Sequence, residues 1–368
     1  MEKYSGFKVK ILILCNHRPD RAPGQRFRFE QYVTYLRANG HIVVQSPIIS
    51  DAEDIYTQSS GDFLRKIKMA IRSISIRIKD SFKCRGFDIV FIYREALYFG
   101  PPIFERLMHS LGLRTILDFD DAIWLYGESN ANSIKNLIRN TQKTSELVGL
   151  VNLVIVGNNY LANYCKSNGC NNVIVIPTTI DTEEYSPSPK NKPLGSPIVI
   201  GWSGSKSTIK HFELSLPFLK QIKLKYGPVV EFCVYGDEDY YSPELNLQGK
   251  PWCKNTEIND LNYIDIGIMP LNDNEWTRGK CGLKGLQYMA LEIPTLMSPV
   301  GANLEIIQHG INGYLPSNNT EWVKHLSDLI ESEELRVQLG KAARMTVRER
   351  YSYESRKKQF LLAIESLE

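Results

Sequence analysis

Short apolar runs alternate with helical stripes along the first part of the chain. Residues 9–15 form a mainly apolar run, which is typical of a strand buried in a parallel sheet. A loop with prolines and a glycine follows, and regularly spaced apolar side chains then predict a helix over 29–36. A second strand is expected at 41–44. This order of strand, loop, helix and strand opens a doubly wound α/β fold.

The alternation continues to a linker and then starts again. Strands are expected at 88–93, 115–117, 153–156 and 173–176, before a stretch rich in proline, serine and lysine. We place the linker at 187–196. Beyond it, strands are expected at 198–200, 229–235, 265–269 and 294–297, with helices at 210–225, 282–291 and 353–367. The pattern predicts two Rossmann-like domains, 1–186 and 197–351, that face each other across a cleft, and a final helix, 352–368, that packs back on the first.

Composition excludes several classes of protein. Hydrophobic residues make up 43% and charged residues 23% of the chain, as in ordinary soluble domains. The net charge of +3 is too small for a dedicated nucleic-acid binder. The seven cysteines are scattered without a C-x-x-C pair, so a zinc ribbon is not expected, and the thiols indicate a reducing, cytoplasmic setting. No apolar window is long enough to cross a membrane.

The loop at 16–28 follows the first strand and opens a helix. Gly24, Gln25 and Arg26 in this loop are candidate ligands for a phosphate, because backbone N–H groups at a helix start attract anions. A solvated turn with surface arginines is the alternative. The loop lacks a G-x-G-x-x-G pattern, so it does not decide between the two on its own.

A group of acids follows another predicted strand, in the run TILDFDDAIW at 115–124. Asp118, Asp120 and Asp121 repel one another there and must meet water, a cation or the hydroxyl groups of a ligand. Arg94, at the end of the preceding strand, is a candidate helper. The D-x-D pattern also suggests a magnesium-dependent phosphohydrolase with a second acidic cluster at 236–241. Ala122 stands where such enzymes need threonine or valine, which counts against that alternative.

The segment GWSGSKST at 201–208 follows the first strand of the second domain. It is a near miss for an ATP-binding P-loop, because Ser205 stands where the motif has its second glycine. Gly204, Lys206 and Lys210 still stand in or beside a loop ahead of a helix, which suits a diphosphate.

The segment 273–290 carries the most specific signal. Glycines open a helix whose start is crowded by Arg278, Lys280 and Lys284. Cations oppose the dipole at a helix N-terminus, so they are expected there if an anion lies between them and the backbone of Gly282 and Leu283. An ordinary solvated helix start is the alternative.

A basic amphipathic helix is expected at 63–85. Apolar residues recur every three or four positions from Phe63 to Phe82, among many lysines and arginines. Such a helix can lie on anionic lipid, which would bring the protein to the inner face of the cytoplasmic membrane. The alternative is an apolar stripe that faces the core and a basic face in solvent.

Together these segments resemble the family-4 glycosyltransferases of the GT-B fold, over almost the whole chain. The resemblance is strongest in the second domain, in VIGWSGSKST, IDIGIMPL, RGKCGLKGLQYMA, SPVGANLEII and HGINGYL. In the first domain, IVGNNYLANYC and VIPTTIDTEEY look like the end of the family's acceptor domain.

The resemblance implies a reaction and a set of contacts. A nucleotide-diphosphate sugar of the UDP or GDP type would bind mainly to the second domain and an acceptor to the first, with retention of configuration and without a metal or other cofactor. The expected donor contacts are Gly24, Gln25, Arg26, Gly204, Lys206, Lys210, Lys280, Gly282, Leu283 and Gln287. Arg94 and Asp118 are expected to bind the acceptor, and Asp120, Asp121 and Lys284 to take part in catalysis.

Two positions depart from the family pattern. The family's Glu-x7-Glu falls at Gly279 and Gln287, and neither is glutamate. Gln287 still offers a donor and an acceptor to ribose hydroxyls. The family's arginine for the diphosphate is Trp202 here, so Lys206 and Lys210 are expected to replace it.

The sequence therefore predicts a cytoplasmic glycosyltransferase, peripheral on the membrane, that moves a hexose-type sugar to a glycan or lipid-linked acceptor. The expected setting is the synthesis of cell-surface polysaccharide such as lipopolysaccharide or capsule, and no nucleic-acid partner is expected. A nucleotide-sugar-binding partner without activity is a further alternative, because both glutamates are missing.

Overall fold

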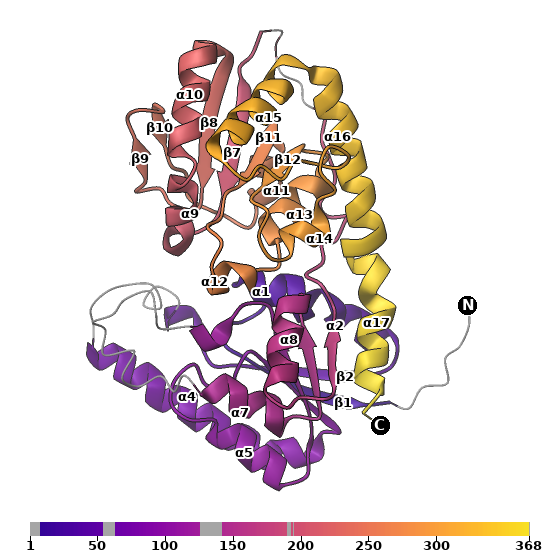
Figure 1. The fold of residues 1–368 in the computed structure, drawn as a ribbon. Helices are drawn as coiled ribbons and strands as arrows, with labels where there is room; N and C mark the ends of the chain where they lie inside the picture. The colour runs from indigo at the N-terminus through magenta and orange to yellow at the C-terminus, as the bar shows by residue number, and fades with distance from the viewer. Residues whose placement is uncertain (1–7, 54–62, 126–141, 190–192, 194, 368) are drawn as a thin grey trace. The chain divides into compact units, whose positions relative to one another are not determined.

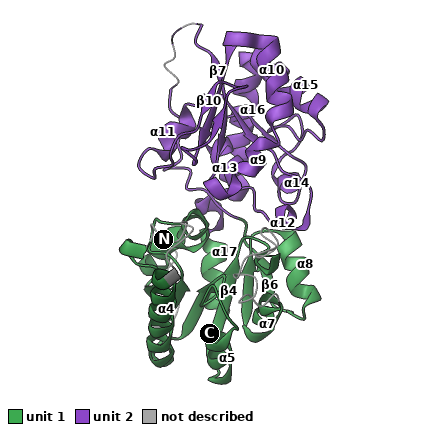
Figure 2. Ribbon diagram, turned by 90° about the vertical axis from the view of Figure 1, so that its left-hand side faces the viewer, with its two compact units in different colours: residues 1–177, 357–368 green, residues 178–356 purple. Residues whose placement is uncertain are grey.

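The computed structural model describes residues 8–53, 63–125, 142–189, 193 and 195–367. The chain divides into two compact units (Figure 1, Figure 2). Unit 1 comprises residues 1–177 and 357–368, and unit 2 comprises residues 178–356. Both are α/β units with parallel sheets, as the sequence predicts.

The division lies ahead of the linker that composition predicts at 187–196. Residues 178–186 belong to unit 2 because polar groups of that unit hold them. Arg344 donates hydrogen bonds to the carbonyl oxygens of Tyr185 and Thr182, at 2.9 and 3.0 Å, and the Tyr185 hydroxyl donates to Glu257 at 2.7 Å. A linker composition marks a loop, whereas these long-range contacts decide which unit the loop joins.

Unit 1 is built on a six-stranded parallel sheet in the order β2-β1-β3-β4-β5-β6. Its strands are β1 (Lys10–Cys15), β2 (Ile42–Pro47), β3 (Ile89–Tyr93), β4 (Arg114–Phe119), β5 (Leu153–Val156) and β6 (Val173–Val175). The inner strands are buried on both faces, which explains their continuous apolar runs. The order reverses between β1 and β3, where folds of this kind bind ligands.

The strands of unit 1 are connected mainly by helices. These are α1 (Pro23–Gln25), α2 (Gln31–Ala38), α4 (Phe63–Lys83), α5 (Ile103–Ser110), α7 (Lys143–Leu150) and α8 (Asn159–Ser167), with a π-helical turn at Arg26–Glu30. The chain returns to unit 1 within α17 (Tyr353–Glu365). Phe360 of α17 stacks on Tyr32 of α2 with ring centroids 4.3 Å apart. This contact holds the end of α17 against α2 within unit 1.

Unit 2 is built on a smaller parallel sheet in the order β12-β11-β7-β8. Its strands are β7 (Ile198–Ser203), β8 (Val230–Tyr235), β11 (Ile266–Met269) and β12 (Thr295–Met297), and β9 (Tyr241–Ser242) forms a hairpin with β10 (Leu247–Gln248). The helices are α9 (Ile209–Glu213), α10 (Leu216–Tyr226), α11 (Glu257–Asn262), α12 (Glu275–Arg278), α13 (Leu283–Ala290), α14 (Asn303–Ile306), α15 (Asn319–Glu331) and α16 (Glu333–Thr346).

The helix expected at 210–225 is two helices. Pro217 stands in the first turn of α10, where its missing N–H costs no hydrogen bond, so the chain starts a new helix there. Phe218 of α10 stacks on Trp322 of α15 with centroids 4.6 Å apart, within the core of unit 2. None of the helices in the described ranges is long and apolar enough to span a membrane.

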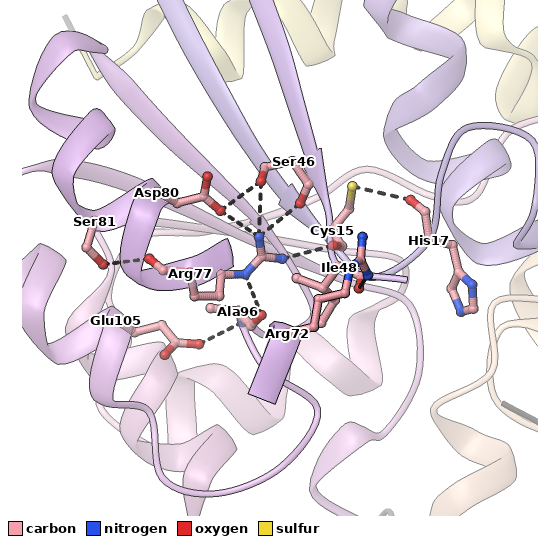
Figure 3. Close-up of polar contacts among 10 residues, drawn as sticks. All are labelled: Cys15, His17, Ser46, Ile48, Arg72, Arg77, Asp80, Ser81, Ala96 and Glu105. Atoms are coloured by element: carbon pink, nitrogen blue, oxygen red, sulfur yellow. Dashed lines mark hydrogen bonds and ion pairs between the residues drawn. The ribbon is translucent and has the colours of Figure 1, made fainter. Parts of the chain in front are cut away.

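Arg77 of α4 binds the ends of three strands in unit 1 (Figure 3). Its side chain is fully buried, and its N–H groups donate to the carbonyl oxygens of Cys15, Ser46 and Ala96 at 2.9, 2.9 and 2.7 Å. Cys15 and Ser46 lie at the ends of β1 and β2, and Ala96 follows β3. Asp80, one turn later on α4, accepts at 2.8 Å and supplies the countercharge. Arg77 therefore fixes which side of α4 faces the sheet.

We predict that Arg77→Met lowers the free energy of unfolding by about 3–5 kcal/mol, because it leaves the Asp80 carboxylate buried without its partner. Arg72→Met on the same helix is the control. Arg72 is partly exposed and pairs with Glu53, so its loss should cost about 1 kcal/mol or less. Urea unfolding of the two variants measures both values. Equal losses would show that Arg77 does not hold the strand ends together.

Candidate functional site

In unit 2, the strand order reverses between β7 and β11, so the loops after these strands border the expected ligand site. Gly204 follows β7, and its N–H donates to the carbonyl oxygen of Tyr235 at 2.9 Å. Gly236 follows β8, and a Cβ atom there would lie 2.2 Å from the carbonyl oxygen of Gly204. The two loops are in such close contact that only glycine fits at 236.

The helix α13 is held firmly behind this edge. Its Tyr288 hydroxyl accepts a hydrogen bond from the Ser203 N–H at 2.7 Å, which ties the helix to the end of β7. Gly282 caps the helix start with a φ of 71°, in the left-handed region, and a Cβ there would lie 2.3 Å from Ile306. The N–H groups of the first turn, starting at Leu283, have no partner within the helix.

Lys284 lies in this first turn and has an incomplete set of partners. Its Nζ lies 4.0 Å from the ring centroid of buried Trp202 and 3.4 Å from Thr208 Oγ1. Burial, and then the charge of neighbouring Lys280, hold the pKa of the Lys284 amine well below its ordinary value. No carboxylate bonds to Lys284 within the described residues. Two cations at a helix N-terminus repel each other and the dipole, which is the arrangement that an anion would relieve.

His211 of α9, which sequence reasoning missed, lies close enough to the same lysines to be affected by their charge. It is 7% exposed, and its Nε2 has no hydrogen-bond partner in the described parts of the chain. Burial, and then the charges of Lys280, Lys284 and Lys210, lower the pKa of His211 to about 3. The imidazole is therefore neutral, and three lysines stand around it. Its position directly after Lys210 was the only signal that the sequence offered.

Other residues expected at the donor site lie elsewhere or have other partners. Lys206 is exposed and pairs with Asp239, itself exposed. Gln287 is buried, and its amide donates to Glu257 at 3.1 Å and to the Tyr185 hydroxyl at 3.2 Å. Arg278 pairs with Asp273 at the surface. The amide of Gln287 thus supports the interior of unit 2, and its expected contact with ribose needs these bonds to break.

In unit 1, Arg94 and two of the predicted acids come together at the ends of β3 and β4. Arg94 donates to Asp120 and to Asp121, both at 2.7 Å, and the Tyr93 hydroxyl donates to Asp120 at 3.0 Å. Arg94 has a φ of 63°, a left-handed conformation that costs free energy in a residue other than glycine. The backbone of Gly24 lies against this group, since a Cβ there would come within 2.3 Å of the Tyr93 hydroxyl.

The surroundings of Asp120 favour its ionised form. Burial raises the pKa of Asp120, but the charges of Arg94 and Arg28 outweigh it, and the resulting pKa lies below the ordinary value. An ionised carboxylate with a low pKa is a weak base but a good hydrogen-bond acceptor. The group formed by Arg94, Asp120 and Asp121, which are all partly exposed, is therefore suited to bind hydroxyl groups.

Asp118 does not reach this surface, which corrects the expectation that it binds an acceptor. It is fully buried, and Arg28 donates to both of its carboxylate oxygens, at 3.1 and 2.6 Å. The end of the strand is the reason, because Asp118 lies within β4, which ends at Phe119, whereas Asp120 lies beyond it. Only the residues beyond the strand end turn toward the loops.

Gln25 and Arg26 also contact other residues of unit 1. Gln25 is fully buried, accepts from the His17 N–H at 2.8 Å and donates to Glu30 at 2.8 Å. Arg26 is 8% exposed, with its guanidinium 5.0 Å from the ring centroid of Phe27. These bonds give Gln25 a structural role in the loop after β1. Donor contacts through Gly24, Gln25 and Arg26 stay predictions.

A family model matches most of the second unit. Residues 186–346 match the family model described as glycosyl transferases group 1. Most of unit 2 therefore matches this family model. The match begins beside the expected linker and ends in α16, so it contains Gly204, Lys284 and the helix α13. No curated protein sequence matches the chain.

Similarity to solved structures shows that the chain has a GT-B fold. HepE from Anabaena, solved with UDP and glucose, has a TM-score of 0.69 and 15% identity, and the match covers 97% of this chain and 100% of HepE. Sucrose-phosphate synthase from Thermosynechococcus elongatus has a TM-score of 0.71 and 13% identity, with 98% and 99% covered. TarM has a TM-score of 0.56 and 18% identity, with 75% of this chain and 54% of TarM covered.

We predict that Lys284→Met raises the Kd for UDP or GDP at least about tenfold, which is about 1.4 kcal/mol, because the diphosphate loses its partly buried cation. Lys206→Met is the matched control. Lys206 is exposed and already paired, so the Kd should change by less than about twofold. Calorimetric titration of both variants measures the two values, and a larger effect at Lys206 would place the diphosphate at the surface loop instead.

The lowered pKa of Lys284 also predicts a pH dependence. Only the protonated amine attracts a diphosphate, and its pKa lies well below the ordinary value of 10.5, so affinity should fall with rising pH before an ordinary lysine would lose its proton. In Lys284→Met this fall should be largely absent. Titrations over a series of pH values measure it. If the wild type and the variant lose affinity in parallel, Lys284 does not carry the dependence.

Proposed function

We propose that this protein transfers a sugar from a nucleotide-diphosphate sugar to an acceptor hydroxyl group. The observation that carries the proposal is the pair of cations at the start of α13, Lys280 and Lys284, with neutral His211 beside them. Both lysines and the helix N-terminus favour an anion at the strand edge where open α/β sheets bind ligands. Residues 186–346 match the model of glycosyl transferases group 1, which agrees with a diphosphate as that anion.

The chemistry follows from where charge develops. The acceptor oxygen forms a bond to the anomeric carbon, the bond from that carbon to the diphosphate breaks, and the hydroxyl proton leaves with the departing diphosphate. Negative charge therefore grows on the diphosphate as the bond breaks. Preorganised donors at that position stabilise the transition state by about 3–4 kcal/mol for each donor. Lys284 and the N–H groups at Leu283 and beyond are such donors, because they are fixed before the substrate binds.

The acceptor is proposed to bind to unit 1. Arg94, Asp120 and Asp121 present both charges at the ends of β3 and β4, and hydroxyl groups both donate to carboxylates and accept from guanidinium. A glycan, free or linked to a lipid, supplies hydroxyl groups of this kind. The proposed setting is cytoplasmic synthesis of a cell-surface polysaccharide.

The donor is proposed to be a UDP or GDP sugar, transferred with retention and without a metal. UDP is supported by the similar structures, since HepE was solved with UDP and with UDP-glucose. Lysines and backbone N–H groups at α13 supply positive charge that a metal would otherwise supply.

The phosphohydrolase alternative needs Asp118 as an accessible nucleophile. In the structure both carboxylate oxygens of Asp118 bond to Arg28, and the side chain is fully buried. A phosphate has no path to that carboxylate without the loss of this ion pair. The second acidic cluster, at 236–241, lies in the other unit. The geometry therefore favours glycosyl transfer.

The test is a thermal-shift and turnover experiment with UDP, GDP, ADP and inorganic phosphate, each with magnesium and with chelator. A ligand at about a hundred times its Kd adds about 2.7 kcal/mol of stability. We expect one nucleoside diphosphate to raise the melting temperature equally in both buffers, and its sugar to be consumed. Stabilisation by phosphate and magnesium alone would contradict the proposal, and nucleotide binding without any turnover would indicate an inactive partner.

We also predict that Asp120→Asn lowers the transfer rate by about 10²-fold, since the variant loses the charge that orients an acceptor hydroxyl. Its Kd for the nucleotide should remain within about twofold of the wild type, because the diphosphate is proposed to bind at α13 and not at Asp120. Initial rates and titrations separate the two effects. A variant with full activity would remove Asp120 from the site.

A further inference from the structure

The apolar stripe of α4 faces outward. Leu64, Ile67, Ile71, Ile78 and Phe82 are 79%, 40%, 60%, 46% and 81% exposed. Their spacing places them along one side of the helix. A soluble helix normally turns such a side to the core, so this row of large apolar side chains in solvent calls for a partner.

The buried side of α4 explains why the stripe is outside. Met69, Ser73, Arg77, Asp80 and Cys84, just beyond the helix end, form the buried row, and they too recur every three or four positions. Arg77 in this row holds the strand ends through its hydrogen bonds (Figure 3). Because the two rows lie on opposite sides, the apolar stripe is forced into solvent. This overturns the alternative in which the stripe faces the core.

The flank of the apolar stripe is basic. Arg65, Lys68, Lys79 and Lys83 are exposed beside it, and Arg72, which pairs with Glu53, lies in the same row. The only acid within α4 is Asp80, which is buried with Arg77. In Figure 1, α5 lies alongside α4, and it exposes two more apolar side chains, Ile103 and Leu107.

We propose that the outer face of α4 binds the surface of an anionic lipid bilayer, with the apolar row in the acyl boundary and the basic row among the headgroups. A helix that lies in a membrane interface needs one apolar side and a basic flank, and α4 has both. The charge complementarity favours anionic lipid over a second copy of this face, since two basic flanks would repel each other. A nucleic acid would use the basic row but leave the apolar row in water.

This inference goes beyond the proposed function and does not depend on it. Vesicle binding needs neither nucleotide nor acceptor, so it is measured on the full chain without either. Failure of the donor-site experiments would leave the inference standing, and failure here would leave the donor site standing. If both hold, the enzyme works at a membrane, which agrees with a lipid-linked acceptor.

The experiment is flotation with vesicles of phosphatidylcholine alone and of phosphatidylcholine with phosphatidylglycerol. We expect the full chain to float only with the mixed vesicles, and less at high salt. Ile71→Ser with Ile78→Ser keeps the net charge and should lower partitioning about tenfold or more. Lys79→Gln with Lys83→Gln should lower it by a similar factor through charge alone.

Matched controls change the same kinds of residue elsewhere. Leu224→Ser with Leu362→Ser alters two exposed leucines on α10 and α17, and Lys324→Gln with Lys341→Gln alters two exposed lysines on α15 and α16. Both controls should float as the wild type does. Circular dichroism checks that each variant folds. If the isoleucine variant of α4 does not fold, the lysine variant of α4 alone tests whether this face binds lipid.

Three results would overturn the proposal. The first is no flotation with either kind of vesicle. The second is an equal loss of flotation in the controls and in the α4 variants. The third is a dimer in light scattering that Ile71→Ser with Ile78→Ser turns into monomer, together with an absence of vesicle binding, because the face would then be covered by a second copy.

Discussion

The guanidinium of Arg77 lies in the interior of unit 1, where an unpaired charge would cost several kcal/mol. Carbonyl oxygens at the ends of β1 and β2 and after β3, together with Asp80, satisfy it. These strands border the point where the strand order reverses, so one side chain holds the edge that positions Arg94. The same contacts set the rotation of α4 and leave its apolar row outside. In unit 1, both the position of Arg94 and the exposure of the apolar row of α4 thus depend on Arg77.

Lys284 in unit 2 is the opposite case. It is a partly buried cation at a strand edge, but a hydroxyl and an aromatic face are its contacts among the described residues, with Lys280 beside it. Arg77 has a carboxylate and three carbonyl oxygens as partners, whereas Lys284 has no bonded carboxylate among the described residues. Catalysis of glycosyl transfer needs positive charge there before bond cleavage begins, because donors that are already fixed cost no reorganisation in the transition state.

Much of the fold and part of the candidate site were predictable from the sequence, because they depend on local patterns. Apolar runs marked the strands, and the loops after them marked the candidate site residues, among them Lys284 and Asp120. What failed depended on contacts between distant residues. The burial of Asp118 requires Arg28, and Lys206 pairs with Asp239 across a loop. Periodicity showed that α4 is amphipathic, but its core side is polar and is stabilised by distant carbonyl oxygens. These long-range hydrogen bonds cannot be predicted from a local sequence pattern.

A crystal structure of the protein with UDP tests the central claim most directly, because the claim concerns where a diphosphate binds. The account predicts phosphate oxygens within hydrogen-bond distance of Lys284 Nζ and of the N–H groups at the start of α13, at about 2.7–3.2 Å. A diphosphate bound instead at the exposed Lys206, or to the loop after β1 alone, would contradict it.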